Sequence, residues 1–504
     1  MERPFPHVRY FILFICINFV NYLDRGIIPG ASAELNEFII DSLHTKQPDV
    51  FLGILQSSFI VGFSIASLVF ANLAKFSPPL KLVTRGMLIW CLAIFGCSMC
   101  GGSAGKMSYL ALVFFRMLSG VGEASFCCIV PPLIQERGGS RAGAWIAAFY
   151  TAIPVGTALG FAYASVVAGS PLGWQMAYLM EALLMLPLVA LLGAAARRYA
   201  RALPAPRHHH QRAYALLGED GEPAAGPGLA LALALGEGGE EDEGSSLYSA
   251  DCGGGGSGLG RGRGRGGSTL LADVRAVLSR PTFTLTVLGY SCYTAVTVGL
   301  STFGAAFLVD LGFFSTETEA SVTFGGVVSL AGLVGTPVGG LLLDAYKVDG
   351  PARLHLGCLQ NLLLAASAAA LLAPTALVAD VRVYAALLGL ACCVLFAVTA
   401  GFNVAVMLSV PPELRALALA LNTLGIHALG DVPSPVVVGA LKDAWAPGCV
   451  HGAATPACRA DRPAIRMVEL ATLSYLWVAV AFLAAAWAAE RRRARGRRVA
   501  ADGG

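Results

Sequence analysis

The chain has 504 residues, of which 56% are hydrophobic and 13% are charged, and its formal net charge is +3. Its mean hydropathy is +0.66. A soluble globular protein typically has about 25% charged residues, about twice the share found here. The composition therefore excludes an ordinary soluble protein and predicts a helical membrane protein with many spans.

Apolar segments of about 20 residues or more recur along the chain. A segment of this length can cross a bilayer as a helix. The first runs into the polar stretch Asn21–Arg25 without a small-residue cleavage site, so we expect it to act as a span and as the insertion signal. Twelve spans are expected, at 8–29, 49–75, 81–102, 108–132, 142–168, 175–196, 282–310, 321–346, 353–374, 380–409, 412–441 and 466–490.

A segment unlike a membrane span separates the sixth span from the seventh. It contains the acidic run GEGGEEDEG at 236–244 and the glycine-rich run GGGGSGLGRGRGRGG at 253–267. Such low-complexity sequence buries too little apolar surface to order itself. We expect a disordered, solvated linker rather than a nucleic-acid or lipid contact. The predicted domains are an N-terminal six-helix bundle (1–196), the linker (197–280), a C-terminal six-helix bundle (281–490) and a basic tail (491–504).

The distribution of Lys and Arg predicts the orientation in the membrane. With twelve spans, the basic clusters, including the tail RRRARGRR at 491–498, fall on one side, so both termini and the linker are expected to be cytosolic. The loops of the opposite side are poorer in Lys and Arg, except the 442–466 loop, which has four such residues. The membrane itself, plasma or endolysosomal and vacuolar, is left open. Cys449 and Cys458 share a loop on the opposite side, where they either pair in an oxidising compartment or stay free.

The two halves resemble each other weakly. The fourth span ends in VPPLIQERGGSRAGA (130–144) and the tenth in SVPPELRALALA (409–420), each with a Pro-Pro, then an acid, then an arginine. Two parallel six-span repeats are typical of the major facilitator architecture.

Five motifs in order make a more specific resemblance. The motifs are NYLDRG (21–26), FANLAKFSPPLKL (70–82), RMLSGVGEASF (116–126), AGAWIAAFYTAIPVGTALG (142–160) and IHALGDVPSPVVVGALKD (426–443). They resemble a major facilitator superfamily transporter of the Spinster family, in particular its plant- and protist-type sphingolipid transporter-like members. The match fails in the linker. The superfamily's acidic loop motif is present as GGLLLD (339–344), but its first-half counterpart near Ala74 has no acid.

The resemblance implies an all-α membrane protein with twelve transmembrane helices in two six-helix bundles related by pseudo-two-fold symmetry. It implies a secondary active transporter that works by alternating access, is coupled to protons and moves amphiphilic lipids such as sphingolipids, sphingosine-1-phosphate or lysophospholipids. The implied partners are the lipid substrate, protons and membrane lipids, with no cofactor, metal or nucleic acid.

Charged residues inside the spans are the main site candidates, because an ionised group in the bilayer normally faces a partner or a water-filled cavity. Arg116 and Glu123 are seven positions apart, so a helix places them on one face about 10 Å apart. Asn21 and Arg25 share a face of the first span, and Asp24 precedes Arg25. We expect Glu123, coupled to Asp24, to be a proton-linked switch, with both arginines as anion partners; the alternative is a structural ion-pair network.

Four further positions are weaker candidates. Glu181 in the sixth span is either a buried ion-pair partner or part of the substrate and proton pathway. His427 and Asp431, four positions apart, either relay protons or orient the prolines that follow. Asp344 is expected to be a gating latch at the cytosolic edge, capping a helix or binding a loop arginine.

The sequence is also compatible with two rival functions. One is a carrier of a small organic anion or sugar, and another is a transport-inactive membrane scaffold or sensor. Neutralising the buried charges separates them, because a scaffold tolerates the change and a transporter does not. The sequence contains neither a phosphate-binding Walker loop nor an HExxH motif, so we expect no enzyme.

Overall fold

The computed structural model describes residues 8–74, 77–102, 105–137, 142–202, 270–348, 350–449 and 455–502. These residues form helices joined by short connections, and none of them is in a strand. The helices before Ala196 and after Thr269 belong to one compact unit.

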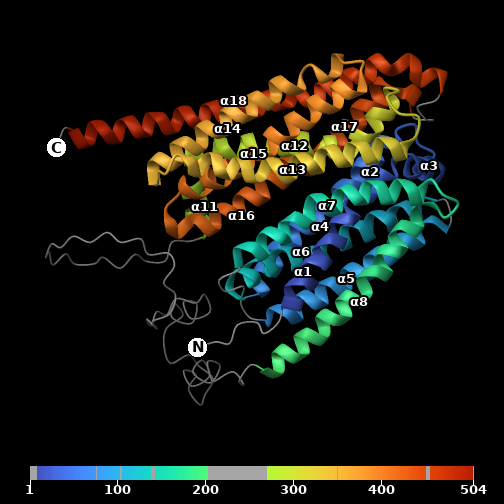
Figure 1. Cartoon of the computed structure of the whole chain (residues 1–504), viewed down its shortest axis with the longest axis horizontal. Helices are drawn as coiled ribbons and strands as arrows, with labels where there is room; N and C mark the ends of the chain where they lie inside the picture. The colour runs from blue at the N-terminus through green and yellow to red at the C-terminus, as the bar shows by residue number, and fades with distance from the viewer. Residues whose placement is uncertain are drawn as a thin grey trace. The chain divides into compact units, whose positions relative to one another are not determined.

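The described residues of the first half of the chain, drawn from blue to green in Figure 1, form eight α-helices. They are α1 (Val8–Asp24), α2 (Ile27–Gly30), α3 (Ser32–Leu43), α4 (Pro48–Leu73), α5 (Pro79–Met99), α6 (Lys106–Arg137), α7 (Ala142–Ala168) and α8 (Gly173–Ala202). Within this half, α4 and α5 pack on α6, and α1 packs on α7.

The second half, drawn from yellow to red, begins with α11 (Leu270–Leu278), a helix inside the range that the sequence assigns to the linker. Then follow α12 (Pro281–Asp310), α13 (Glu317–Ala345), α14 (Gly350–Leu372), α15 (Val381–Leu408), α16 (Arg415–Ile426), the π-helical turn η5 (His427–Asp431), α17 (Pro433–Trp445) and α18 (Pro456–Asp502). Here α12 packs on α18, and α15 packs on both α13 and α14.

Eleven helices in the described part of the chain are long and apolar enough to cross a membrane. The remaining expected span, 8–29, is α1 followed by a turn at Arg25–Gly26 and the short α2. The turn lies tightly against α7, because a Cβ atom on Gly26 would sit 2.4 Å from the carbonyl carbon of Gly160. The count is therefore compatible with the twelve predicted helices.

Glycines on α6 allow two neighbouring helices to approach closely. A Cβ on Gly120 would lie 2.1 Å from the carbonyl oxygen of Phe59 on α4, and one on Gly122 would lie 2.6 Å from that of Gly86 on α5. Small residues at a membrane helix interface allow this backbone contact. These close approaches place α6 between α4 and α5.

The two halves meet most extensively at two helix crossings, α4 with α17 and α7 with α13. At the first, Gly439 leaves room for the carbonyl of Asp49, which lies 2.2 Å from the position of a Cβ. At the second, the rings of Phe161 and Phe324 lie 5.7 Å apart. These crossings bring residues of both halves to a common site.

Candidate functional site

Two ion pairs connect the end of α1 with α6. Nη1 of Arg116 lies 2.7 and 2.8 Å from the two carboxylate oxygens of Asp24. Nη2 of Arg25 lies 2.9 Å from Oε1 of Glu123. Each arginine therefore pairs with the acid of the other helix, and Arg116 does not contact Glu123, which lies two turns along the same helix.

Aromatic rings surround both guanidinium groups. The ring of Phe59 on α4 lies 4.1 Å from the guanidinium carbon of Arg25 and 5.2 Å from that of Arg116. Tyr178 on α8 also faces Arg116, at 5.7 Å. Ring faces attract cations, most strongly where water is excluded. Phe59 therefore helps to hold the two positive charges side by side.

The pairs differ in exposure. The side chains of Asp24, Arg116 and Glu123 are at most 1% exposed, whereas that of Arg25 is 25% exposed. A buried ion pair is stabilised only while both partners remain, because each isolated charge loses its hydration. Arg25 is thus the most exposed member of the cluster.

Glu181 on α8 is a third buried carboxyl beside these pairs. It is 1% exposed, and neither of its oxygens has a hydrogen-bond partner among the described residues. It is close enough to Asp24 and Arg116 for their charges to act on it. The structure therefore brings Glu181 to the cluster without giving it an arginine of its own.

The asparagines of α1 have separate environments. Asn18 donates a 2.8 Å hydrogen bond to the carbonyl of Phe149 on α7. Asn21 is fully buried, and its amide group has no hydrogen-bond partner within the described part of the chain. Asn18 therefore ties α1 to α7, while Asn21 carries unused hydrogen-bonding capacity next to the charged pairs.

The second half contributes His427 and Asp431, whose Nδ1 and Oδ2 atoms lie 2.7 Å apart. Both residues belong to the turn η5, whose last hydrogen bond runs from Val432 to His427 just before the proline that starts α17. Single π-helical turns are frequent at functional sites. The ring of Phe63 lies 6.0 Å from that of His427 and 5.7 Å from the guanidinium carbon of Arg25, so one side chain joins the candidates of both halves.

Asp344 lies apart from this cluster. Its Oδ1 accepts a 2.6 Å hydrogen bond from Nη2 of Arg353, in the first turn of α14, and its side chain is 65% exposed. Of the two contacts expected for Asp344, the structure shows the one with an arginine, and both residues lie in the second half.

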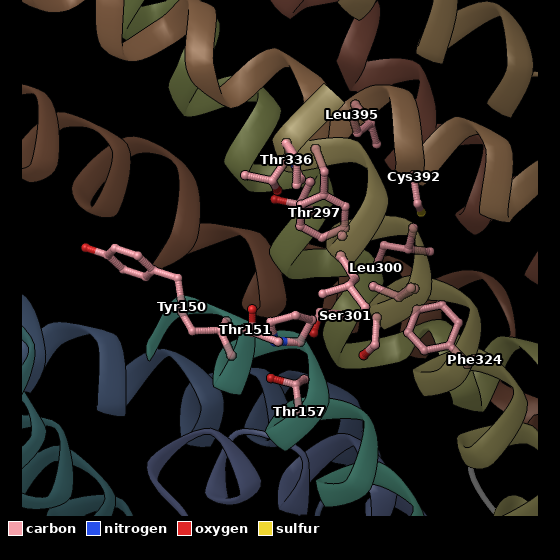
Figure 2. A pocket seen from close by; sticks show the side chains of 18 residues that line it. Tyr150, Thr151, Thr157, Thr297, Leu300, Ser301, Phe324, Thr336, Cys392 and Leu395 are labelled. Carbon is pink, nitrogen blue, oxygen red and sulfur yellow. The ribbon is translucent and has the colours of Figure 1, made fainter. Parts of the chain in front are cut away.

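An apolar cavity of about 520 Å³ lies between α7 of the first half and α12, α13 and α15 of the second. Figure 2 shows Thr157 on α7 at one side and Leu300, Thr336 and Leu395 at the other. No charged residue lines it, and its polar groups are mainly hydroxyls. The sequence does not reveal this site, because its residues look like ordinary span residues and become a cavity only when four helices meet.

A second charged cluster, also missed, closes the α4–α17 crossing. Nζ of Lys442 lies 3.2 Å from Oδ2 of Asp49 on α4 and 3.1 Å from Oδ2 of Asp310 on α12. Asp443 accepts hydrogen bonds from the backbone N–H groups of Asp49 and Val50 at the start of α4. The available signal was the Lys-Asp pair that ends the fifth motif.

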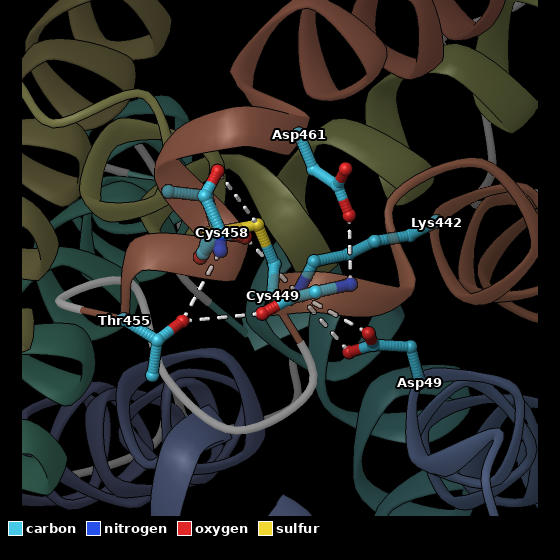
Figure 3. The surroundings of a disulfide bond; sticks show 8 residues. Asp49, Lys442, Cys449, Thr455, Cys458 and Asp461 are labelled. Atoms are coloured by element: carbon cyan, nitrogen blue, oxygen red, sulfur yellow. Dashed lines mark hydrogen bonds and ion pairs between the residues drawn. A yellow bond between two sulfur atoms is a disulfide. The ribbon is translucent and has the colours of Figure 1, made fainter.

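The loop beside this cluster is held by a disulfide between Cys449 and Cys458. Figure 3 shows it close to Lys442 and Asp49, with Asp461 nearby. The Oδ2 atom of Asp461 accepts a 2.7 Å hydrogen bond from the N–H of Gly448. Of the two alternatives that the sequence left open for these cysteines, the structure contains the paired one.

Comparison with known proteins shows to which superfamily the chain belongs. The family model described as Major Facilitator Superfamily matches residues 14–435, so the chain belongs to this superfamily of membrane transporters. A solved bacterial homologue of the human lysosomal transporter Spinster, inward-facing and unoccupied, matches with a TM-score of 0.68 at 17% identity, over 97% of this chain and 98% of that one. A D-xylose–proton symporter matches with a TM-score of 0.59 at 14% identity, over 93% and 96%. These likenesses confirm the predicted fold.

Within the superfamily, the chain belongs to the Spinster family. It is 30% identical over 451 residues to the probable sphingolipid transporter spinster homolog 2 of Arabidopsis thaliana, which covers 87% of this chain and 82% of that protein. It is 25% identical over 445 residues to protein spinster homolog 1 of Homo sapiens, covering 85% and 71%. The resemblance found in the five motifs is confirmed: the chain is a multi-pass membrane transporter and not an enzyme.

Proposed function

We propose that the chain moves amphiphilic lipids, such as sphingolipids, sphingosine-1-phosphate or lysophospholipids, by alternating access coupled to protons. The observation that carries this proposal is a buried ion-pair cluster whose most exposed member is Arg25, in a protein that also has an apolar cavity between its halves. One part suits an anionic head group and the other an apolar chain. The names of the plant relatives point to the same class of cargo.

The cavity supports a lipid more than a sugar. Its walls are mostly apolar, with scattered hydroxyl groups from Tyr150, Thr151, Thr157, Thr297, Ser301, Ser329 and Thr336. A site for a polyhydroxylated sugar needs a hydrogen-bonding partner for each hydroxyl, because a buried unpaired polar group costs free energy. An apolar chain needs none, so the cavity favours a lipid tail over the rival sugar substrate.

The proton step is assigned to Glu123. While Glu123 is ionised, it occupies Arg25 through the 2.9 Å ion pair. Protonation removes that partner, and Arg25 becomes available to the phosphate of a lipid head group, which a guanidinium binds well. Asp24 stays with Arg116, while Asn21 and Glu181 supply polar groups close by. His427 and Asp431 face the same region through Phe63 and extend the pathway into the second half.

The organisation in the membrane is part of the proposal. Residues 1–196 and 281–490 form two six-helix bundles joined by a cytosolic linker at 197–280, with a basic cytosolic tail at 491–504. The disulfide between Cys449 and Cys458 supports this orientation, because disulfides persist in oxidising compartments and the loop lies opposite the basic clusters. Asp344 with Arg353 then lies at the cytosolic edge as a gating contact.

The test is transport in proteoliposomes with labelled lysophospholipid and sphingosine-1-phosphate, with and without a pH gradient. We compare the wild type with Glu123→Gln, and use Asp41→Asn, an exposed acid of α3, as the matched control. Gradient-driven lipid flux in the wild type and the control, lost in Glu123→Gln, is expected. Equal lipid exchange without a gradient in all three proteins would show that the variant is folded.

Two results would refute the proposal. Flux that is unchanged in Glu123→Gln, with the same pH dependence, would leave the carboxyl as a structural ion-pair member. The absence of flux of either lipid by well-folded protein would favour a carrier of small organic anions, to be screened next. A transport-inactive scaffold would transport neither lipids nor small organic anions, and it would tolerate neutral residues throughout the ion-pair cluster.

A further inference from the structure

Glu317, the first residue of α13, binds the start of α3 in the other half of the chain. Its Oε1 accepts hydrogen bonds from the backbone N–H and the hydroxyl of Ser32, at 2.8 and 2.5 Å. The N–H of Ala33 lies 3.3 Å from the same oxygen. The first N–H groups of a helix have no partner within the helix, and they favour a carboxylate. The contact therefore joins the two halves at the α3 end.

A second carboxyl, Glu34, lies in the same contact. Glu34 follows Ala33 in the first turn of α3, the turn whose N–H groups bind Glu317, and the charges of the two acids act on each other. Two carboxyl groups can hydrogen-bond to each other only when one of them carries a proton. Within the described part of the chain, neither acid forms an ion pair with a lysine, arginine or histidine, so no cation compensates two negative charges here.

The other charged groups near Glu34 and Glu317 do not supply a positive charge that could replace the proton. The charge of Glu37, one turn along α3, also acts on Glu34 and is negative. Asp49 at the start of α4 accepts a hydrogen bond from Asn36 of α3 and is itself paired with Lys442. The segment of α7 that approaches Glu34, up to Gly169, contains no charged residue. Apart from the N–H groups at the start of α3, both acids therefore face a neutral or negative environment.

From this geometry we infer a proton-binding site at Glu34 and Glu317, in which one shared proton keeps the two halves closed at the α3 end. Loss of the proton leaves two adjacent carboxylates without a cation, and their repulsion opens the contact. The inference rests on the alternating access of the proposed function, and it adds a second proton site, separate from Glu123, that acts on the gate.

The direction of the pH effect follows from the same contact. Burial raises the pKa of the Glu34 carboxyl, in a helix outside the candidate membrane spans. An acid whose pKa is higher in the closed state binds its proton more tightly there, so low pH favours closure and rising pH removes it. Linkage to one proton changes the ratio of open to closed molecules by about tenfold per pH unit at most.

The experiment measures the distance across this contact by double electron–electron resonance, without lipid cargo and without a pH gradient. Spin labels are attached at Asp41→Cys on α3 and Ser315→Cys before α13, both exposed positions, in a protein in which the exposed Cys16 is replaced by serine. Distances are recorded in nanodiscs from pH 5 to pH 8. Because no transport is measured, the outcome does not depend on the identity of the cargo.

The compared variants are Glu317→Gln and Glu34→Gln, with Glu319→Gln as the matched control. In Glu317→Gln the side chain still accepts hydrogen bonds from Ser32 but cannot ionise. We therefore expect the contact between the halves to stay closed at every pH in this variant. We expect Glu34→Gln to lose most of the pH response, and the exposed Glu319 variant to behave as the wild type does. A wild-type distance that ignores pH, or a Glu317→Gln protein with the wild-type response, would overturn the inference. Failure of lipid transport with an intact pH response would overturn only the proposed cargo.

Discussion

The substitution Arg116→Gln tests whether the buried ion pairs hold α1 to α6. Arg116 and Asp24 are 1% and 0% exposed, and Nη1 of Arg116 contacts both oxygens of Asp24. Removal of the arginine leaves a buried carboxylate without its partner. Breaking a buried pair in this way costs about 3–5 kcal/mol of folding free energy, and we expect a loss of that size.

The double variant Arg116→Gln/Asp24→Asn separates the lost charge from the lost packing. It puts two neutral amides in place of the pair, so no isolated charge remains buried. We expect it to be more stable than Arg116→Gln alone, with a coupling energy of about 2 kcal/mol. Arg382→Gln, at an exposed arginine in the first turn of α15, serves as the control and should change stability by less than about 0.5 kcal/mol.

The assay is reversible unfolding of the purified protein in mixed detergent micelles, with helix content followed by circular dichroism. The free energy of unfolding is compared for the wild type, the single variants and the double variant. A loss below about 1 kcal/mol for Arg116→Gln, in the range of an exposed pair, would refute the reasoning. So would single losses that simply add up in the double variant, because that result means that the two side chains do not interact.

Three further changes test other parts of the structure. Gly120→Leu should prevent stable folding, because a Cβ would lie 2.1 Å from a backbone oxygen of α4, whereas Gly326→Ala, with open space around it, should fold normally; size-exclusion profiles after purification distinguish them. Reduction of Cys449–Cys458, nine positions apart, should lower stability by about 2–3 kcal/mol through loop-closure entropy; an unchanged thermal midpoint with dithiothreitol contradicts this. Thr336→Phe, at a side chain that lines the cavity, should abolish lipid flux with an unchanged melting temperature, and full flux would show that the lipid tail binds elsewhere.

Much of the fold followed from the sequence alone, because span length and the absence of charge are local properties. Most segments with twenty apolar residues became helices close to their expected limits, although the eleventh is broken by the turn η5 and the last extends from Pro456 to Asp502. The five motifs indicated the family. The charged positions Asp24, Arg25, Arg116 and Glu123 also stood out by themselves, because charges inside a span are rare and costly.

Only the tertiary structure decided which of these charges meet. The spacing of Arg116 and Glu123 suggested one face of one helix, but two helical turns separate them, and the packing of α1 on α7 and α6 gives each arginine the acid of the other helix. The contacts between the halves were hidden for the same reason. Asp49, Glu317 and Lys442 lie at the ends of spans, where charges are common, and nothing local shows which of them lie side by side. Their pairing depends on the crossing of α4 with α17 and on the position of α3 beside α13, which are long-range contacts that no single segment encodes.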